Sequence, residues 1–436
     1  MKRLWTLLMA VVLLLSFSLT ASAEDWTTKD ITLTFLHGHT DDGVAKVITS
    51  QGFRAMVDKF LAEHPNVKIE EERSSEQGTL MLQQMAADNL TDIVCFGYSA
   101  LRSLTEAEQL ADITDLVDTS KYADNCVSCS INGRVYGLPM KQTEYNYVYY
   151  NENLLHEAGL EEFPKTLEEF LAMDKYFDEK GIDLIALGNN VVWWTPTTFL
   201  TALVYEILGP EKAYSLITSD GTVKWTDPGV IEALNWLPKI AATCNVDFNS
   251  RDDIWAAGWY AQGKAFCYPG GSWVGNTIKT FAEDYPDVVN ATRCAIVPSI
   301  SGEKDKTFLS GAGAESYGIS AKLKRGTPEF DAAFALISQI ASKDYADMMV
   351  SNGTISAPLT DLEPDVTQFP PMIQDFLAVH NSGYQVGASM HIFMDVSVLN
   401  VLEATLPPFM AGEMSVEDVA AKVEEAAESF REDLED

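Results

Sequence analysis

Hydrophobic and polar residues follow two regular spacings in the part of the chain that begins at residue 31. The segment Ile31-Thr-Leu-Thr-Phe35 alternates with a period of two, which predicts a β-strand. Apolar residues between Phe53 and Leu61 recur every three or four positions, which predicts an amphipathic helix. The same patterns predict strands at residues 67–71 and 92–97 and a helix at residues 80–87.

This order of strands and helices is typical of an α/β fold with a parallel, doubly wound sheet. In such sheets, ligands bind beyond the carboxyl ends of the strands. The loops at residues 37–43 and 97–101 each follow a predicted strand, so we expect functional side chains there.

Helix starts are marked by capping residues farther along the chain. Thr166 and Glu169 have the spacing of a capping box, and Thr327 precedes a proline that suits the first helical position. Ser415 precedes Asp418 by three positions and predicts the start of a final helix. The sequence contains no internal repeat and no low-complexity linker.

The first 23 residues have the pattern of an export signal. Lys2 and Arg3 are followed by an apolar run over residues 4–20 and then by Ala21-Ser-Ala23, a typical cleavage site. No cysteine precedes Cys95, so we expect no lipid anchor. The mature protein is therefore predicted to be free in a periplasm or outside the cell.

The length of the chain indicates how many domains it forms, and its charge indicates which partners are unfavourable. The 413 residues that would remain of 436 after removal of the first 23 suggest two or three domains at about 100–200 residues each. The sequence has 64 acidic and 30 basic residues, a net charge of −34. Such a surface repels nucleic acid phosphates and anionic lipids, so neither is expected as a partner.

Six cysteines in an exported chain raise the question of disulfides. Cys126 and Cys129 are predicted to lie in a polar loop, where they could pair with each other or bind a metal. Cys95, Cys267 and Cys294 lie within apolar runs and are expected to behave as small core residues. Zinc needs four ligands, and the sequence has no second C-x-x-C and no nearby histidine pair.

Residues 136–177 contain the most distinctive pattern of the chain. It runs through Tyr136-Gly-Leu-Pro-Met, Glu144-Tyr-Asn-Tyr-Val-Tyr-Tyr-Asn151, Glu157-Ala-Gly159 and Phe163-Pro-Lys-Thr-Leu-Glu-Glu-Phe170. This pattern resembles the crossover segment of family 1 extracellular solute-binding proteins, the sugar-capturing components of bacterial importers. In that family the strand links two lobes and contributes side chains to the cleft between them.

Further segments resemble the same family in the same order along the chain. They are Thr91-Asp-Ile-Val with Gly97 and Leu110-Ala-Asp-Ile-Thr-Asp-Leu116, Gly263-Lys-Ala-Phe-Cys-Tyr-Pro-Gly-Gly-Ser-Trp273, Ala295-Ile-Val-Pro298 with Gly311-Ala-Gly and Gly318-Ile-Ser, and Ala411-Gly-Glu-Met-Ser415. Thr91 replaces the proline that is usual in the family, and the loop with Cys126 and Cys129 is not a family feature.

The resemblance implies a type II periplasmic-binding-protein-like fold, with two doubly wound α/β lobes joined by crossover hinge segments around a cleft. The implied first lobe comprises residues 24–143 and about 308–350. The second lobe comprises residues 144–307 and about 351–436, and residues 1–23 are the signal peptide.

The function implied by the resemblance is capture of a carbohydrate, an oligosaccharide by preference, and delivery to an ABC-type membrane permease on separate chains. The protein is expected to be a monomer without cofactor or metal.

A sugar presents hydroxyls that donate and accept hydrogen bonds, and flat C–H faces that stack on aromatic rings. The resemblance therefore assigns Glu144 to the cleft face of the crossover strand and Trp273 to a stacking role. The alternatives are a structural salt bridge for Glu144 and a core position for Trp273. Adjacent Trp193 and Trp194 point apart, so one of them is expected to face the cleft. The expected ligand-binding residues are His37, His39, Thr40, Asp41, Tyr98, Glu144, Trp193, Trp194, Gly271, Ser272, Trp273, Glu315 and Tyr317.

Alternative readings exist for the first loop and for the whole protein. His37-Gly-His39-Thr-Asp41-Asp42 could bind zinc, contact the sugar or form a surface turn. Aromatic and acidic residues suit a polyamine or another cationic ligand as well as a sugar. A secreted carbohydrate-active enzyme is the alternative from another class, although the sequence has no G-x-S-x-G or H-E-x-x-H motif.

Overall fold

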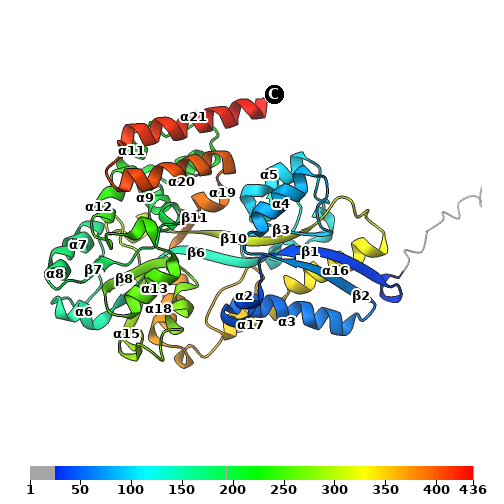
Figure 1. Ribbon diagram of the computed structural model, residues 1–436, viewed down its shortest axis with the longest axis horizontal. Coiled ribbons are helices and arrows are strands. Elements are labelled where there is room, and N and C mark those ends of the chain that lie inside the picture. The colour runs from blue at the N-terminus through cyan, green and yellow to red at the C-terminus, as the bar shows by residue number, and fades with distance from the viewer. Residues whose placement is uncertain (1–24, 192–193, 436) are drawn as a thin grey trace, which may run out of the picture.

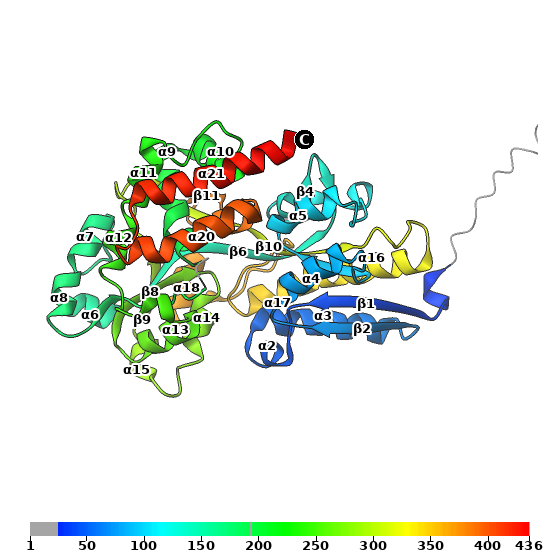
Figure 2. The same ribbon diagram turned by 45° about the horizontal axis from the view of Figure 1, so that its top comes forward.

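Figure 1 shows the computed structural model, which describes residues 25–191 and 194–435. The predicted signal peptide and Trp193 lie outside the described residues. Two α/β lobes lie side by side along the long axis, and two long strands, β6 (Leu138–Asn151) and β10 (Phe308–Ile319), run between them. Figure 2 shows the same arrangement from a tilted view.

The elements of the first lobe follow the alternation expected from the sequence. They are β1 (Ile31–His37), α2 (Asp41–Lys46), α3 (Ile48–Glu63), β2 (Val67–Arg73), α4 (Gln77–Ala86), β3 (Ile93–Phe96), α5 (Tyr98–Glu106), β4 (Ser130–Ile131), β5 (Arg134–Val135), α16 (Pro328–Ile340) and α17 (Lys343–Ser351). The three predicted strands and two predicted helices at residues 31–97 are confirmed, with bounds shifted by a few residues.

The second lobe is built mainly from the middle and the end of the chain. It contains α6 (Glu152–Glu157), α7 (Leu167–Ala172), α8 (Asp174–Asp178), β7 (Asp183–Ile185), a π-helix η5 (Pro196–Leu200), α9 (Thr201–Leu208), α10 (Pro210–Thr218), α11 (Pro228–Leu234), α12 (Leu237–Ala241), α13 (Asp253–Ala261), β8 (Ala265–Gly271), α14 (Val274–Lys279), α15 (Pro286–Asn290), β9 (Thr292–Ile296), α18 (Pro371–His380), β11 (Gln385–Ala388), α19 (Met390–Phe393), α20 (Val396–Met410) and α21 (Val416–Glu435).

Short 3₁₀ helices complete the described chain. They are η1 (Trp26–Thr28), η2 (Thr114–Leu116), η3 (Thr119–Lys121), η4 (Val127–Cys129), η6 (Phe248–Ser250), η7 (Lys304–Lys306) and η8 (Val366–Gln368). No helix of the described residues is both long enough and apolar enough to cross a membrane.

The predicted helix caps are confirmed. Thr166 and Glu169 form a complete capping box, and the Thr327 hydroxyl accepts a hydrogen bond from the backbone N–H of Phe330. The Ser415 hydroxyl accepts one from the N–H of Asp418 at 3.1 Å. These bonds satisfy donors that a helix start otherwise leaves unpaired.

Within the described residues, nine strands form one mixed sheet in the order β2-β1-β3-β10-β6-β8-β7, with β11 beside β10 and β9 beside β6. The pairs β1–β2 and β1–β3 are parallel, as expected for a doubly wound lobe. The pair β7–β8 is also parallel, whereas β6 and β10 run antiparallel to each other.

Two hydrophobic cores lie on the two sides of the crossover. We call the core around Phe35 and Phe53 the first core and the core around Tyr149 and Phe266 the second core. Strands β6 and β10 contribute to both of them. In β6, Leu138 and Met140 belong to the first core and Tyr145, Tyr147 and Tyr149 to the second. The exact lobe boundaries given above stay a prediction.

A β-bulge interrupts β6 where it passes into the second core. The register with β8 shifts between Tyr145 and Tyr147, and the intervening Asn146 has a φ of 77°. Asparagine tolerates this left-handed conformation better than most residues. Its side-chain amide donates to the Phe308 carbonyl of β10 at 2.7 Å, which ties the bulge to the second crossover strand.

All six cysteines lie in the described ranges and are free thiols. Cys95, Cys267 and Cys294 are buried, as predicted. Cys126 and Cys129 lie in the predicted loop, around η4, but both side chains are fully buried in the first core and no disulfide joins them. The loop folds inward around Asp124, whose carboxylate accepts hydrogen bonds from the N–H of Cys126 at 3.0 Å and of Ser128 at 3.2 Å.

Candidate binding site

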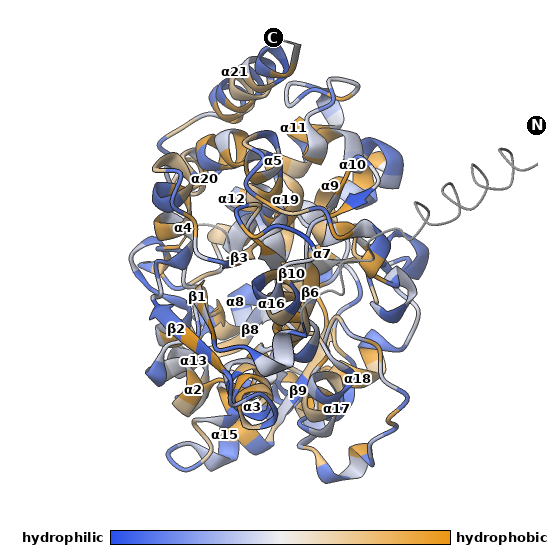
Figure 3. Cartoon of the chain, turned by 90° about the vertical axis from the view of Figure 1, so that its right-hand side faces the viewer, coloured by the Kyte–Doolittle hydropathy of each residue, from blue (hydrophilic) through white to orange (hydrophobic). Residues whose placement is uncertain are grey.

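Strand β6 has a cavity on each of its faces. Lys141 lines a cavity of about 330 Å³ together with His39 and Glu315, and we call it the front cavity. Gln142 and Glu144 line a larger cavity of about 1140 Å³, the rear cavity. Successive side chains of a strand point to opposite faces, so this division follows directly from the alternation along β6. Figure 3 shows α4 and α13 on one side of the crossover strands and α10 and α18 on the other.

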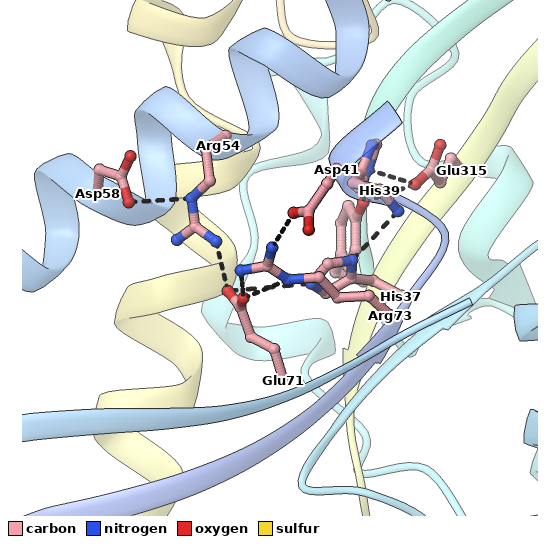
Figure 4. Close-up of polar contacts among 9 residues, drawn as sticks. His37, His39, Asp41, Arg54, Asp58, Glu71, Arg73 and Glu315 are labelled. Atoms are coloured by element: carbon pink, nitrogen blue, oxygen red, sulfur yellow. Dashed lines mark hydrogen bonds and ion pairs between the residues drawn. The ribbon is translucent and has the colours of Figure 1, made fainter. Parts of the chain in front are cut away.

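His39 is the centre of the polar contacts in the front cavity. Its Nδ1 lies 2.9 Å from the Ser50 hydroxyl, and its Nε2 lies 2.9 Å from both the Tyr317 hydroxyl and a carboxylate oxygen of Glu315. The ring stacks on Phe53 at a centroid distance of 4.0 Å. The imidazole is therefore fixed in orientation from three sides, and Figure 4 shows it beside Glu315.

Glu315 is an ionised carboxylate at the edge of the front cavity. Burial acts to raise its pKa, but the nearby charge and hydrogen bond of His39 and the charge of Lys141 hold that pKa well below its usual range. The Tyr317 hydroxyl also donates to this carboxylate at 2.6 Å, and burial raises the pKa of Tyr317 well above its usual value. Tyr317 itself is fully buried, so it supports Glu315 and His39 from behind.

His37 is the buried end of an ionic network beneath the loop. Its side chain is fully buried, with Nε2 3.9 Å from Glu71, and burial lowers its pKa despite that carboxylate. Glu71 also accepts hydrogen bonds from Arg54 at 2.6 Å and from Nε of Arg73 at 2.8 Å. Burial opposes ionisation of Glu71, but these donors and His37 hold its pKa far below the usual range. Figure 4 shows how this network lies against β1 and β2.

The other residues of the first loop hold it in shape. The Thr40 hydroxyl caps α2 by accepting from the N–H of Gly43 at 3.3 Å. Asp41 is exposed and forms an ion pair with Arg73 at 2.6 Å. In the described part of the chain, no group of three or more histidine, cysteine or acidic side chains is arranged to hold a metal ion.

The aromatic part of the site is built where β8 ends. Tyr145 points to the same face of β6 as Lys141, and its ring meets the edge of Trp273 at 5.5 Å. Trp273 is half-buried and lies directly over Gly271, whose lack of a side chain makes room for the indole. Ser272 joins this turn to β6, because its N–H donates to the Glu144 carbonyl at 2.8 Å.

Trp194 lies behind Trp273 rather than beside it. It is 1% exposed, stacks on Tyr268 at 5.9 Å and meets Trp273 edge-on at 5.8 Å. Trp194 therefore fixes the position of Trp273, while direct contact of Trp194 with a ligand stays a prediction. Tyr98 occupies the first turn of α5 and packs on Phe393 at 4.6 Å, at a contact between the lobes.

Glu144 lies on the rear face, opposite Lys141 and Tyr145. The residue is 3% exposed, and its carboxylate accepts hydrogen bonds from the Tyr147 hydroxyl at 2.6 Å and from Nδ1 of His380 at 2.9 Å. Burial acts to lower the pKa of His380, but the hydrogen bond and the charge of Glu144 outweigh it and raise that pKa. The bulge at Asn146 places Tyr147 on the same face as Glu144, three positions away.

The structure thus places the ligand-binding residues expected from the sequence on both faces of β6 and at a contact between the lobes. His39 and Glu315 line the front cavity, and Trp273, with Gly271 and Ser272, lies on the same face of β6. Glu144 lies on the other face and Tyr98 at a contact between the lobes. Sequence reasoning missed Gln77, which lines the front cavity, and His380, which meets Glu144 although 236 positions separate them. A ligand role for each of these residues stays a prediction.

We predict that Gly271→Ala displaces Trp273. A Cβ atom at this position would lie 2.0 Å from the indole, so either the ring moves or the core is overpacked. We expect the free energy of unfolding to fall by about 1–3 kcal/mol and the near-ultraviolet circular dichroism of tryptophan to change. Gly78→Ala is the matched control, because its added methyl meets nothing within 4 Å. An unchanged spectrum in Gly271→Ala would contradict the described packing.

We predict that the contact between His380 and Glu144 stabilises the fold more at low pH than at high pH. Because the folded-state pKa of His380 is raised, its stabilising effect is complete below the unfolded value of about 6.5 and is lost as the pH rises through the folded value. Urea unfolding should show that the stability difference between the wild type and His380→Gln shrinks by on the order of 1 kcal/mol between pH 5.5 and 8.5. The same comparison with exposed His156→Gln should show little change, and a pH-independent difference for His380→Gln would refute the coupling.

Comparison with known proteins agrees with this architecture. Residues 55–371 match the family model of the bacterial extracellular solute-binding proteins. The sequence matches no curated protein. A chitin oligosaccharide binding protein is similar in structure, with a TM-score of 0.79 and 20% identity over 91% of this chain and 98% of the other.

Two further solved structures are similar over nearly their whole lengths. RafE in complex with raffinose has a TM-score of 0.70 and 17% identity, covering 91% of this chain and 99% of the other. Maltose-bound MalE3 of T. maritima has a TM-score of 0.71 and 16% identity, covering 92% of this chain and 100% of the other. Identities this low establish the shared fold, and the family match covers well over half of the chain. This chain belongs to the bacterial extracellular solute-binding proteins.

Proposed function

We propose that the protein captures a carbohydrate, most suitably an oligosaccharide, and delivers it to an ABC-type membrane permease on separate chains. The observation on which the proposal rests is the composition of the front face of β6. A half-buried indole, Trp273, lies on the same face as His39, Lys141 and Glu315. A sugar needs one flat apolar surface for its C–H face and several fixed donors and acceptors for its hydroxyls.

The donors and acceptors of the front cavity are held in place before any ligand arrives. His39 is fixed by Ser50, Tyr317 and Glu315, and Trp273 is fixed by Trp194 and Tyr145. Fixed groups cost less entropy to engage than mobile ones, which favours affinity. Lys141 adds a donor from the crossover strand itself.

A sugar fits the front cavity better than a polyamine does. The carboxylate of Glu315 is already compensated by His39 at 2.9 Å and by the nearby charge of Lys141. A cationic ligand would have to compete with both of these groups. The ligands named for the similar structures, chitin oligosaccharide, raffinose and maltose, are also carbohydrates. Capture of this kind needs no covalent step, so we propose a binding protein rather than an enzyme.

Delivery requires two states that a permease can distinguish. We propose that the lobes close around the sugar by a hinge motion in the crossover strands and in residues 352–370, which join α17 to α18. The sugar would favour the closed state by binding it more tightly than the open one. Export of a monomer by the signal at residues 1–23, without a lipid anchor, belongs to the same proposal.

We predict that calorimetric titration of the mature protein finds one saturable site for an oligosaccharide. The panel is chitotriose, maltotriose, raffinose, xylotriose, their monosaccharides and spermidine. Trp273→Ala should weaken binding about tenfold or more, because it removes the stacking surface. Trp236→Ala is the matched control, because Trp236 is also a half-buried tryptophan but its ring lies against Lys239, whereas the ring of Trp273 lies against Tyr145 of β6.

The outcomes separate the alternatives. Binding of spermidine alone would replace sugar capture with uptake of a cation. Breakdown products of a glycan in the titration cell would indicate an enzyme. If no compound of the panel binds, or if Trp273→Ala and Trp236→Ala lose affinity equally, the support for a sugar site on the front face is removed.

A further inference from the structure

The rear cavity is separate from the proposed sugar site. It lies on the opposite face of β6 and has a volume of about 1140 Å³. Its walls come from both lobes, with Asp124 and Val127 on the first and Tyr214 and Phe393 on the second. The crossover strands contribute Gln142, Glu144 and Gly311 to its floor. Pockets that bind small molecules commonly measure about 300–1,000 Å³, so this space is large enough for an organic ligand.

Exposed apolar side chains are concentrated around this cavity. Of the fourteen large hydrophobic residues that are exposed among the described residues, six line the rear cavity. These six are Val127, Tyr214, Leu359, Leu362, Val366 and Val386. Exposed apolar surface gathered in one place usually marks a binding surface, whereas scattered single residues do not.

The charged side chains of the rear cavity are almost all acidic. Asp124, Glu144 and Glu363 line it, and no lysine or arginine is among its described lining residues. His380 is the remaining titratable group with a basic form, and it already donates to Glu144 at 2.9 Å. Three carboxylates outnumber the single histidine of this lining, and this excess of acidic groups favours a cationic ligand and disfavours an anionic one.

Aromatic rings complete the wall. The ring of Tyr205 is seated against Gly387, where an added Cβ would lie 2.4 Å from it, and the Tyr205 hydroxyl accepts a hydrogen bond from the N–H of Ala388 at 2.7 Å. Tyr214 is 44% exposed and Phe393 lines the same space. The buried side-chain oxygen of Gln142 has no hydrogen-bond partner, which leaves one acceptor available on the floor.

We propose that the rear cavity is a second binding site, for an organic cation with an apolar body such as an aromatic or alkyl ammonium compound. Aromatic faces attract ammonium groups through the ring quadrupole, and the carboxylates add a long-range attraction. The aliphatic side chains would cover the apolar body. A sugar or an anion lacks the charge that this lining matches, and a bare metal ion would gain nothing from the aromatic and aliphatic walls.

The test is calorimetric titration of the mature protein with benzyltriethylammonium at about pH 8. Phenylmethanesulfonate, an anion with the same aromatic ring, is the ligand control. Tyr214→Ala removes an exposed ring and Glu144→Gln removes a charge while keeping the shape of the side chain. Trp273→Ala tests whether the cation binds at the front face instead. Thermal unfolding of each variant shows whether it is folded.

We expect one saturable site for the cation, about tenfold weaker in Tyr214→Ala and in Glu144→Gln, equal to the wild type in Trp273→Ala, and no binding of the anion. Absence of cation binding would overturn the proposal. Loss of cation binding in Trp273→Ala with retention in Tyr214→Ala would move the site to the front face. Equal binding of cation and anion would show that the cavity selects apolar bodies without regard to charge. If Glu144→Gln does not fold, Tyr214→Ala still decides between these outcomes, because its side chain lies at the surface.

Discussion

The pairing of β6 with β10 is the interaction on which the rest of this structure depends. The two strands are hydrogen-bonded along the crossover, from Tyr145 opposite Ser310 to Leu138 opposite Tyr317. Each strand contributes side chains to both hydrophobic cores, so each lobe is held to the other by covalent chain and by burial. Any motion of the lobes must bend these strands, because breaking their ladder would expose buried backbone groups. The strands are therefore both the support of the cavities and their shared wall.

The bulge residue Asn146 determines which side chains of β6 share a face. Without the bulge at Asn146, Glu144 and Tyr147 would point to opposite faces, because side chains three positions apart on a regular strand do so. With it, the hydroxyl of Tyr147 reaches the Glu144 carboxylate at 2.6 Å. A buried carboxylate needs such partners to remain ionised at acceptable cost. On one and the same strand, Glu144 thus faces the rear cavity and Lys141 faces the front cavity.

Local sequence patterns predicted the elements well and the site in part. Alternation at residues 31–35 and helical spacing at residues 53–61 suffice because they are set by burial of one face. His39 and Glu315 could be nominated from the loop after β1 and the glycine-rich strand, but their contact at 2.9 Å joins residues far apart in the chain. The contact between Glu144 and Tyr147 could not be predicted from the sequence, since a bulge leaves no mark in a two-residue period. The burial of Cys126 and Cys129 could not be predicted from their polar neighbours, because it results from a loop that folds inward on Asp124.

The order in which the chain supplies its two cores has a consequence for synthesis and secretion. The first core is begun by residues 31–140 but is completed by Tyr317 and Ile319 of β10 and by the apolar face of α16. A nascent chain that ends before these residues cannot bury the surface of its own N-terminal sheet, and each missing side chain withholds about 1.5–3 kcal/mol of hydrophobic stabilisation. The first core therefore lacks part of its side chains until about three quarters of the polypeptide has been made. In the export proposed above, late completion of the first core would keep the polypeptide in a form that can pass through a membrane channel.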